Sequence, residues 1–197
     1  MAVSTAERIL DAALASFAAR GYEATSLDAL AAGLGLTKQA ILYHFASKEL
    51  LLEAVIDHSA VALSATLEDA LREAAPDGWS RIESIVRSVF RLAARQPQLL
   101  GLLREVTRLG PPAATRLMGA LDPLVARATE FLDAEMASGT MRRQEPRLLL
   151  LSAYSAVIGV ATEVEVLRSL GYDPTLRSLV RRRAELLAFL RSALAPT

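Results

Sequence analysis

Apolar side chains recur at helical spacing along almost the whole chain, and this periodicity limits the possible folds more than any other feature. Residues three and four positions apart lie on one face of a helix, and an apolar face must be buried against a neighbour. The clearest stripe near the N-terminus consists of Ile9, Leu10, Ala13, Leu14, Phe17 and Ala18. No segment alternates convincingly as a half-buried strand would. The sequence predicts an all-α protein of about nine helices.

Capping residues and helix breakers divide this pattern into separate helices. The first four helices begin at residues that can cap them, which are Ser4 or Thr5, Thr25 or Ser26, Thr37, and Ser47. Glycines end the first two, at Gly21 and at Gly33 or Gly35. The fourth helix is long, because no glycine or proline interrupts it before about Ala75. Further helices are expected over 79–95, 99–109, 112–138 with a kink at Pro123, 148–170 and 175–194.

Composition excludes several classes of protein. Hydrophobic residues make up 52% of the 197 residues, which is too apolar for a disordered chain. The absence of cysteine excludes disulfides and thiolate metal sites, and two histidines argue against a zinc site. The longest charge-free apolar stretch, 148–162, is shorter than the roughly 20 residues of a membrane span. We therefore expect a soluble cytoplasmic protein without membrane association, metal or cofactor.

Residues 25–45 have the pattern of a helix-turn-helix, with two short helices joined by a turn that contains glycine. Six apolar residues are spaced to pack on one another: Leu27, Leu30, Ala31, Leu36, Ile41 and Phe45. Polar residues gather at the two helix starts, Thr25-Ser26 and Thr37-Lys38-Gln39. Helix starts favour phosphate oxygens, because their free N–H groups point outward. The charges of residues 1–48 cancel, so any DNA binding must depend on position rather than on net charge.

The order of these blocks resembles the TetR family of bacterial regulators over residues 7–53. The matching blocks are Phe17, Gly21-Tyr22, Thr25-Ser26, Ala31 through Thr37, Tyr43-His44-Phe45 and Ser47-Lys48-Glu49-Leu50-Leu51. Each block alone is weak, but all of them in this order are highly specific. At one position the family often has Tyr where this chain has Leu42. The phosphate contact that the family makes with this Tyr is either made by Tyr43 in this chain or absent.

The resemblance implies which residues contact DNA. Thr25, Tyr43, His44 and Lys48 would meet the sugar-phosphate backbone, and Ser26 belongs to the same polar helix start. Thr37, Lys38 and Gln39 would lie at the major groove, where Lys suits guanine and Gln suits adenine. Simpler interpretations remain open: His44 is a packed histidine or a phosphate contact, and Lys48 alone would be an ordinary solvated helix start. His58 is expected to be structural, and Arg181-Arg182-Arg183 a solvated face.

The remaining helices predict a ligand cavity and a dimer interface. Segment 148–162 is apolar on all sides, so it must be covered on all sides. The resemblance assigns one side to the ligand cavity and another to the dimer interface. Candidate ligand-binding residues are Phe90, Leu103, Val106, Thr107, Met118, Tyr154, Ile158 and Thr162. Candidate dimer-interface residues are Leu151, Ser155, Leu176, Leu179, Val180, Leu187 and Leu190.

These features predict a DNA-binding domain over 1–47 and a ligand-binding, dimerising domain over 48–197. The expected function is repression of transcription by a homodimer that a small molecule releases from operator DNA; activation is the alternative sense. Two other classes of protein fit the sequence less well. An enzyme is disfavoured, because no nucleophile elbow, phosphate-binding loop, zinc spacing or dinucleotide fingerprint occurs. A helical protein that uses its N-terminal helices for a protein partner would differ by failing to bind DNA.

Overall fold

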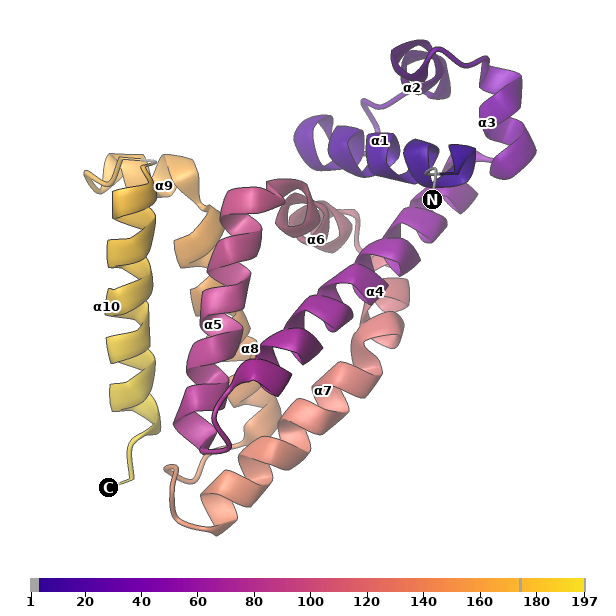
Figure 1. Cartoon of the computed structure of the whole chain (residues 1–197). Helices are drawn as coiled ribbons and strands as arrows, with labels where there is room; N and C mark the ends of the chain where they lie inside the picture. Colours follow the sequence, from indigo (N-terminus) through magenta and orange to yellow (C-terminus); the bar gives the residue numbers. More distant parts are fainter. Residues whose placement is uncertain (1–3, 174, 197) are drawn as a thin grey trace. The chain divides into compact units, whose positions relative to one another are not determined.

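The computed structural model describes residues 4–173 and 175–196, and all regular secondary structure within these residues is α-helical (Figure 1). The all-α prediction is therefore confirmed. The helices are α1 Thr5–Arg20, α2 Leu27–Leu34, α3 Lys38–His44, α4 Lys48–Glu73, α5 Gly78–Arg95, α6 Pro97–Leu109, α7 Ala113–Ala137, α8 Pro146–Thr162, α9 Val164–Ser169 and α10 Leu176–Leu194.

Most helix boundaries fall where the capping residues predict them. Ser4 and Glu7 form a reciprocal capping box at the start of α1, and Thr175 caps α10. One boundary is wrong, because the single helix predicted over 148–170 is two helices that meet at Glu163. This residue has φ −79° and ψ 68°, outside the helical region. Thr162 precedes the break and donates its hydroxyl to the Ile158 carbonyl at 2.8 Å, a bond that competes with the backbone pattern.

The chain divides into two compact units, which we call unit 1 and unit 2. Unit 1 contains the residues up to Leu63 together with Gln98–Leu121. Unit 2 contains Ser64–Pro97 and the residues from Asp122 onward. This division concerns packing, whereas the boundary predicted at residue 47 concerns function and stays a prediction.

The core of unit 1 begins with α1, α2 and α3. Side chains from all three helices are buried together, and α4 and α6 supply further buried residues. Gly101 of α6 lies so close to α1 that a Cβ atom there would be 3.0 Å from the Cβ of Ala18. The main buried residues of this core are Ile9, Ala13, Phe17, Leu30, Ala31, Ile41, Leu51, Val55, Ile56, Leu102 and Val106.

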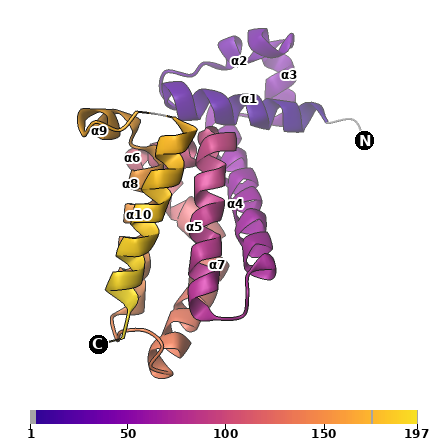
Figure 2. The same ribbon diagram turned by 60° about the vertical axis from the view of Figure 1, so that its left-hand side comes forward.

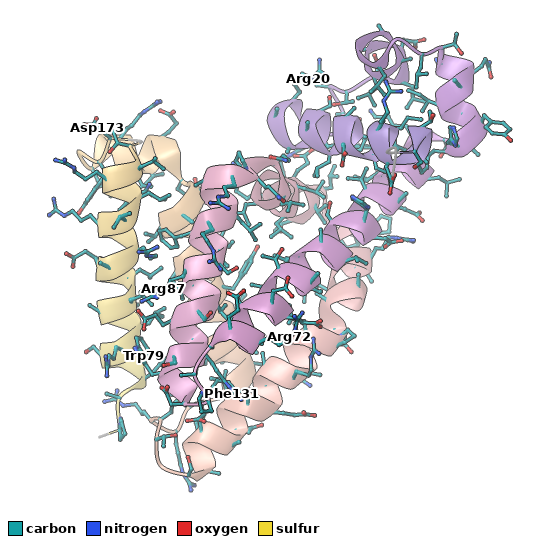
Figure 3. All side chains as sticks on the ribbon, viewed as in Figure 1. Arg20, Arg72, Trp79, Arg87, Phe131 and Asp173 are labelled. Atoms are coloured by element: carbon teal, nitrogen blue, oxygen red, sulfur yellow. The ribbon has the colours of Figure 1, made fainter. Side chains whose placement is uncertain are left out.

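In unit 2, helices α5, α8 and α10 pack side by side (Figures 1 and 2). Arg182 of α10 is buried and donates a hydrogen bond to the Val160 carbonyl of α8. The prediction that residues 181–183 form a solvated face is therefore wrong for Arg182. Near the start of α5, the ring of Trp79 lies 5.2 Å from the guanidinium carbon of Arg191 on α10 (Figure 3).

Helix α4 is long and apolar enough, by length and composition alone, to cross a membrane. Several of its apolar residues are instead buried inside the protein, among them Leu51, Leu52, Val55 and Ile56. Its acidic residues form ion pairs, Glu53 and Asp57 with Arg116 and Glu68 with Arg127. Both features are typical of the core helix of a globular protein.

Candidate DNA-binding site

Helices α2 and α3 form a helix-turn-helix whose geometry is fixed by local signals. Ser26 caps α2 by accepting from the Ala29 N–H at 3.1 Å, and Thr37 caps α3 by accepting from the Ala40 N–H at 3.1 Å. Between them Gly35 has φ +67°, a left-handed conformation that glycine adopts without strain. Leu30 and Ala31 of α2 and Ile41 of α3 are all buried, and the two helices pack against each other. The predicted motif is present at the predicted residues.

The start of α3 presents three exposed polar residues, Thr37, Lys38 and Gln39. The ammonium of Lys38 lies 3.0 Å from the Asp28 carboxylate on α2. Both side chains are largely exposed, and exposed pairs of this kind contribute only about 0–1 kcal/mol. Lys38 can therefore leave Asp28 for a base edge at little cost. No sequence pattern indicates this pair, because the two residues belong to different helices.

Thr25 and Ser26 lie beside each other but have different surroundings. Thr25 is 2% exposed, and its hydroxyl lies 2.9 Å from both the Ser16 hydroxyl and the Gly21 carbonyl. Its side chain is therefore occupied inside unit 1, and the prediction that it meets a phosphate does not fit this structure. Ser26 is exposed. Near them, Arg20 at the end of α1 (Figure 3) also donates to the Ser16 hydroxyl.

The end of α3 and the start of α4 present an aromatic pair and a lysine. Tyr43 is 87% exposed, and its ring lies edge-on to that of His44, with centroids 5.3 Å apart. His44 is also exposed, so it is not a packed core histidine. Leu42 is half-buried, which leaves Tyr43 as the exposed aromatic residue of α3. An exposed hydroxyl and an exposed imidazole are both able to donate a hydrogen bond to a phosphate.

Lys48 is held in place by the segment that follows α1. Its ammonium lies 4.2 Å from the centre of the Tyr22 ring and 3.4 Å from the Glu23 carbonyl. The Tyr22 hydroxyl donates to the Glu49 carboxylate at 3.3 Å. Burial, followed by the charge of Glu49, raises the pKa of Tyr22 to about 12, so its hydroxyl stays protonated. Sequence analysis singled out Lys48 but missed Tyr22 as its support.

Glu105 also supports this segment, a role that no sequence pattern indicates. This residue of α6 is 8% exposed, and its carboxylate accepts the backbone N–H of Tyr22 at 2.7 Å. Arg108 donates to both carboxylate oxygens, at 2.8 and 2.7 Å. The Arg108 guanidinium and, after it, the Tyr22 N–H hold the pKa of Glu105 below its usual range. No sequence signal could have linked Glu105 to a residue 83 positions away.

The predicted ligand-binding residues are divided between the two units. Unit 1 contains Leu103, Val106, Thr107 and Met118, and unit 2 contains Phe90, Tyr154, Ile158 and Thr162. Their exposure is mixed: Phe90, Leu103, Val106 and Ile158 are buried, whereas Thr107, Met118 and Tyr154 are exposed. Both threonine hydroxyls donate to carbonyls one turn earlier in their own helices. The ligand site stays a prediction.

The predicted dimer-interface residues fall into three groups. Leu151, Ser155, Leu176 and Val180 are exposed, as an interface requires of an isolated chain. Leu179 and Leu187 are half-buried, and Leu179 and Val180 line a recess of about 110 Å³ shared with Phe90, Ala94 and three arginines of α5 and α10. Leu190 is only 4% exposed, so it belongs to the core of its own chain and is a wrong choice for the interface.

Phe189, the residue next to Leu190, was missed although it is 61% exposed. It lies seven positions after Arg182, and residues two turns apart share a helix face. Because Arg182 contacts the Val160 carbonyl of α8, Phe189 lies on the α8 side of α10. The apolar stripe in the sequence could not show which of its sides faces inward.

Comparison with known proteins identifies the helix-turn-helix. Residues 9–55 match the family model for bacterial regulatory proteins of the tetR family. This segment belongs to the tetR family. The chain is 27% identical over 149 residues to the HTH-type transcriptional regulator RutR of Escherichia coli K12, which covers 75% of this chain and 69% of RutR. The family and these relatives are transcription regulators, not enzymes, as the sequence predicted.

The fold of solved regulators extends over nearly the whole chain. AibR, solved in complex with isovaleryl coenzyme A and operator DNA, superimposes with a TM-score of 0.78 at 19% identity, covering 95% of this chain and 98% of AibR. A transcriptional regulator of Saccharomonospora viridis, solved in complex with choline, gives a TM-score of 0.78 at 19% identity over 98% of both chains. At this level of identity the likeness concerns the fold.

Proposed function

We propose that this TetR-family regulator represses transcription as a cytoplasmic homodimer that binds operator DNA and is released by a small molecule. The observation that supports this most directly is the group of exposed polar side chains at the start of α3, Thr37, Lys38 and Gln39, within a TetR-family helix-turn-helix. In this motif the first residues of the second helix reach base edges in the major groove.

We divide the DNA contacts into two classes. Thr37, Lys38 and Gln39 read base edges, where the Gln39 amide can pair with adenine and the Lys38 ammonium with guanine acceptors. Ser26, Tyr43, His44 and Lys48 contact the sugar-phosphate backbone and fix the position of α3 without reading sequence. The Thr25 side chain is left out, because its hydroxyl is occupied by Ser16 and Gly21.

The salt dependence of binding should be modest. The acidic and basic residues of segment 1–48 balance, and each basic side chain has a partner within unit 1. These partners are the Leu34 carbonyl for Arg8, the Ser16 hydroxyl for Arg20, Asp28 for Lys38, and the Tyr22 ring and Glu23 carbonyl for Lys48. The salt slope is the change of the logarithm of the binding constant with the logarithm of the salt concentration. Only phosphate contacts that release counterions contribute to it.

We propose that the dimer forms through one face of α8 and the adjoining side of α10. Leu148, Leu151 and Ser155 follow each other at helical spacing, and all three are exposed. Phe189 adds an exposed aromatic ring on the α8 side of α10. Ser155 and Gly159 are small, so a partner helix could approach α8 closely. A two-fold dimer would place two helix-turn-helix motifs on successive major grooves, roughly 34–36 Å apart or a multiple of that.

The effector is proposed to be a small organic molecule. The structural relatives solved with isovaleryl coenzyme A and with choline suggest that this fold accommodates chemically different ligands. The candidate residues remain the eight predicted from sequence, four in each unit. Ligand would shift the population toward conformations in which the two DNA-binding motifs no longer match the operator spacing.

A promoter-binding experiment tests this proposal. Purified protein is titrated onto its own promoter region and onto random DNA of equal length, and the shifted fraction is measured by gel mobility. Tighter binding to the promoter is expected, with loss of the complex when a cognate ligand is added. Equal affinity for both DNAs would contradict the proposed function, and ligand-stimulated transcription from the bound promoter would indicate an activator.

A further inference from the structure

We infer that Glu105 of α6 is a positioning residue for DNA binding, because it fixes the segment that holds the Lys48 ammonium in place. The inference rests on the proposed phosphate contact of Lys48. The observation that supports the inference is a continuous set of contacts within unit 1, which runs from Glu105 through Tyr22 to Lys48. Glu105 itself needs no contact with DNA.

The first contact in this set is a charge-assisted hydrogen bond. The Glu105 carboxylate accepts the Tyr22 N–H at 2.7 Å, a distance typical of the stronger bonds to ionised acceptors. Arg108 donates a hydrogen bond to each carboxylate oxygen and so orients the carboxylate. The site is also sterically matched, since a Cβ atom at Gly21 would lie only 3.3 Å from Glu105 Oε1. Gly21 has φ +87°, so both space and conformation favour glycine here.

The second contact joins Tyr22 to Lys48. The Tyr22 ring packs against Phe17 of the core, with centroids 5.5 Å apart, and carries the Lys48 ammonium 4.2 Å from its centre. The carbonyl of the next residue, Glu23, accepts from the same ammonium at 3.4 Å. Both supports of Lys48 thus belong to the segment whose backbone Glu105 holds. Without Glu105, the Tyr22 N–H would lose its acceptor, and the backbone of this segment would be held less firmly.

This arrangement gives α6 an influence on DNA affinity that depends on Lys48. A lysine on a flexible side chain gains most from a phosphate when its position is set beforehand, because less conformational freedom is then lost on binding. Glu105→Ala should therefore weaken operator binding by roughly tenfold, as is usual for coupled residues in one network. Glu105→Gln should have a smaller effect, since the amide oxygen can still accept from the Tyr22 N–H.

The test is a double-mutant cycle on the full-length protein. Operator affinity is measured over a range of salt concentrations for wild type, Glu105→Ala, Lys48→Ala and the double variant. The matched control is Glu165→Ala, which removes another i,i+3 Glu–Arg pair, with Arg168, far from Lys48 in sequence. Thermal melts by circular dichroism identify the variants that are folded at the assay temperature. If Glu105→Ala is unfolded there, Glu105→Gln replaces it in the cycle.

If Glu105 positions Lys48, Lys48→Ala and Glu105→Ala each lower the salt slope by about one, and the double variant binds like Lys48→Ala. The preference for operator over random DNA should stay unchanged, because base reading is not involved. Additive losses, or a wild-type salt slope in Glu105→Ala, would overturn the inference and leave the Lys48 contact standing. A wild-type slope in Lys48→Ala would instead remove the proposed phosphate contact, and this inference with it.

Discussion

Helices α1 to α3 differ from helices α8 and α10 in the large apolar side chains that they leave exposed. Around the helix-turn-helix, the exposed groups are polar, Thr37, Lys38 and Gln39, with Tyr43 as one amphipathic ring. Helices α8 and α10 expose, besides charged residues, large apolar groups, among them Leu148, Leu151 and Phe189. Exposed apolar residues that follow one helix face suggest a protein partner, whereas polar groups on a helix-turn-helix suit the edges and phosphates of DNA.

This contrast teaches that burial, rather than hydrophobicity, distinguishes an interface residue from a core residue. Leu190 and Phe189 are neighbours in α10, and both are strongly apolar, but only Phe189 is exposed. Equally, Thr25 and Ser26 are neighbours with hydroxyl groups, but only Ser26 is exposed. Four predictions examine the contrast, in order of decreasing effect.

The largest effect is expected from Phe189→Glu. A carboxylate at this position would lie unpaired in the proposed dimer interface, so the protein should become a folded monomer. Because a monomer binds only one half-site, its operator affinity should fall by about 100-fold or more. Sedimentation velocity and operator titration measure both effects. Val61→Glu, at another exposed apolar residue, is the control and should stay dimeric; a dimeric Phe189→Glu variant would contradict the proposed interface.

Leu190→Ala should act on the fold of each chain. Removal of a buried leucine side chain lowers the free energy of unfolding by about 2–5 kcal/mol, whereas Phe189→Ala should change the stability of the isolated chain much less. Urea denaturation of Leu190→Ala in the Phe189→Glu background, compared with Phe189→Glu alone, measures the loss for Leu190 without a contribution from dimerisation. Equal stability of the Leu190→Ala variant and its parent would show that Leu190 is not a core residue.

Gln39→Ala should affect specificity. Loss of its base contact should weaken operator binding by about 1–3 kcal/mol and relax the preference at one base pair. Lys48→Ala serves as the contrasting variant, because loss of a phosphate contact should weaken operator and random DNA alike. Binding to a set of operators with single base-pair changes measures the preference. If Gln39→Ala weakens both kinds of DNA equally, Gln39 is a backbone contact.

The smallest effect concerns pH and Glu105. Its pKa is lowered in the folded protein, chiefly by Arg108, so the unfolded chain binds more protons in acid. The stabilisation is therefore complete above the ordinary value of 4.5 and is lost as the pH falls through the lowered pKa. Urea unfolding of wild type and Glu105→Gln between pH 7 and acid measures it. The difference in stability between the two proteins should shrink below about pH 4.5. A difference that stays constant with pH would show that the ionised Glu105 carboxylate does not stabilise the fold.

The sequence by itself determined most helix boundaries and the helix-turn-helix motif of this protein. Helix boundaries depend on contacts between residues three or four positions apart, such as Ser4 with Glu7 and Thr37 with Ala40. Such contacts form wherever the local sequence allows them, so capping residues and glycines predict them directly. The same local order of residues made the DNA-binding motif recognisable.

The tertiary structure alone decided which side chains are occupied and which are available. Thr25 is occupied because Ser16 lies beside it, Lys38 is paired because Asp28 faces it, and Arg182 is buried because α8 covers it. Each of these outcomes depends on a neighbour at least nine positions away in the chain. Glu105 is the extreme case, since it supports Tyr22 from 83 positions away. A sequence pattern records how residues repeat along a helix, whereas these contacts depend on how separate helices pack.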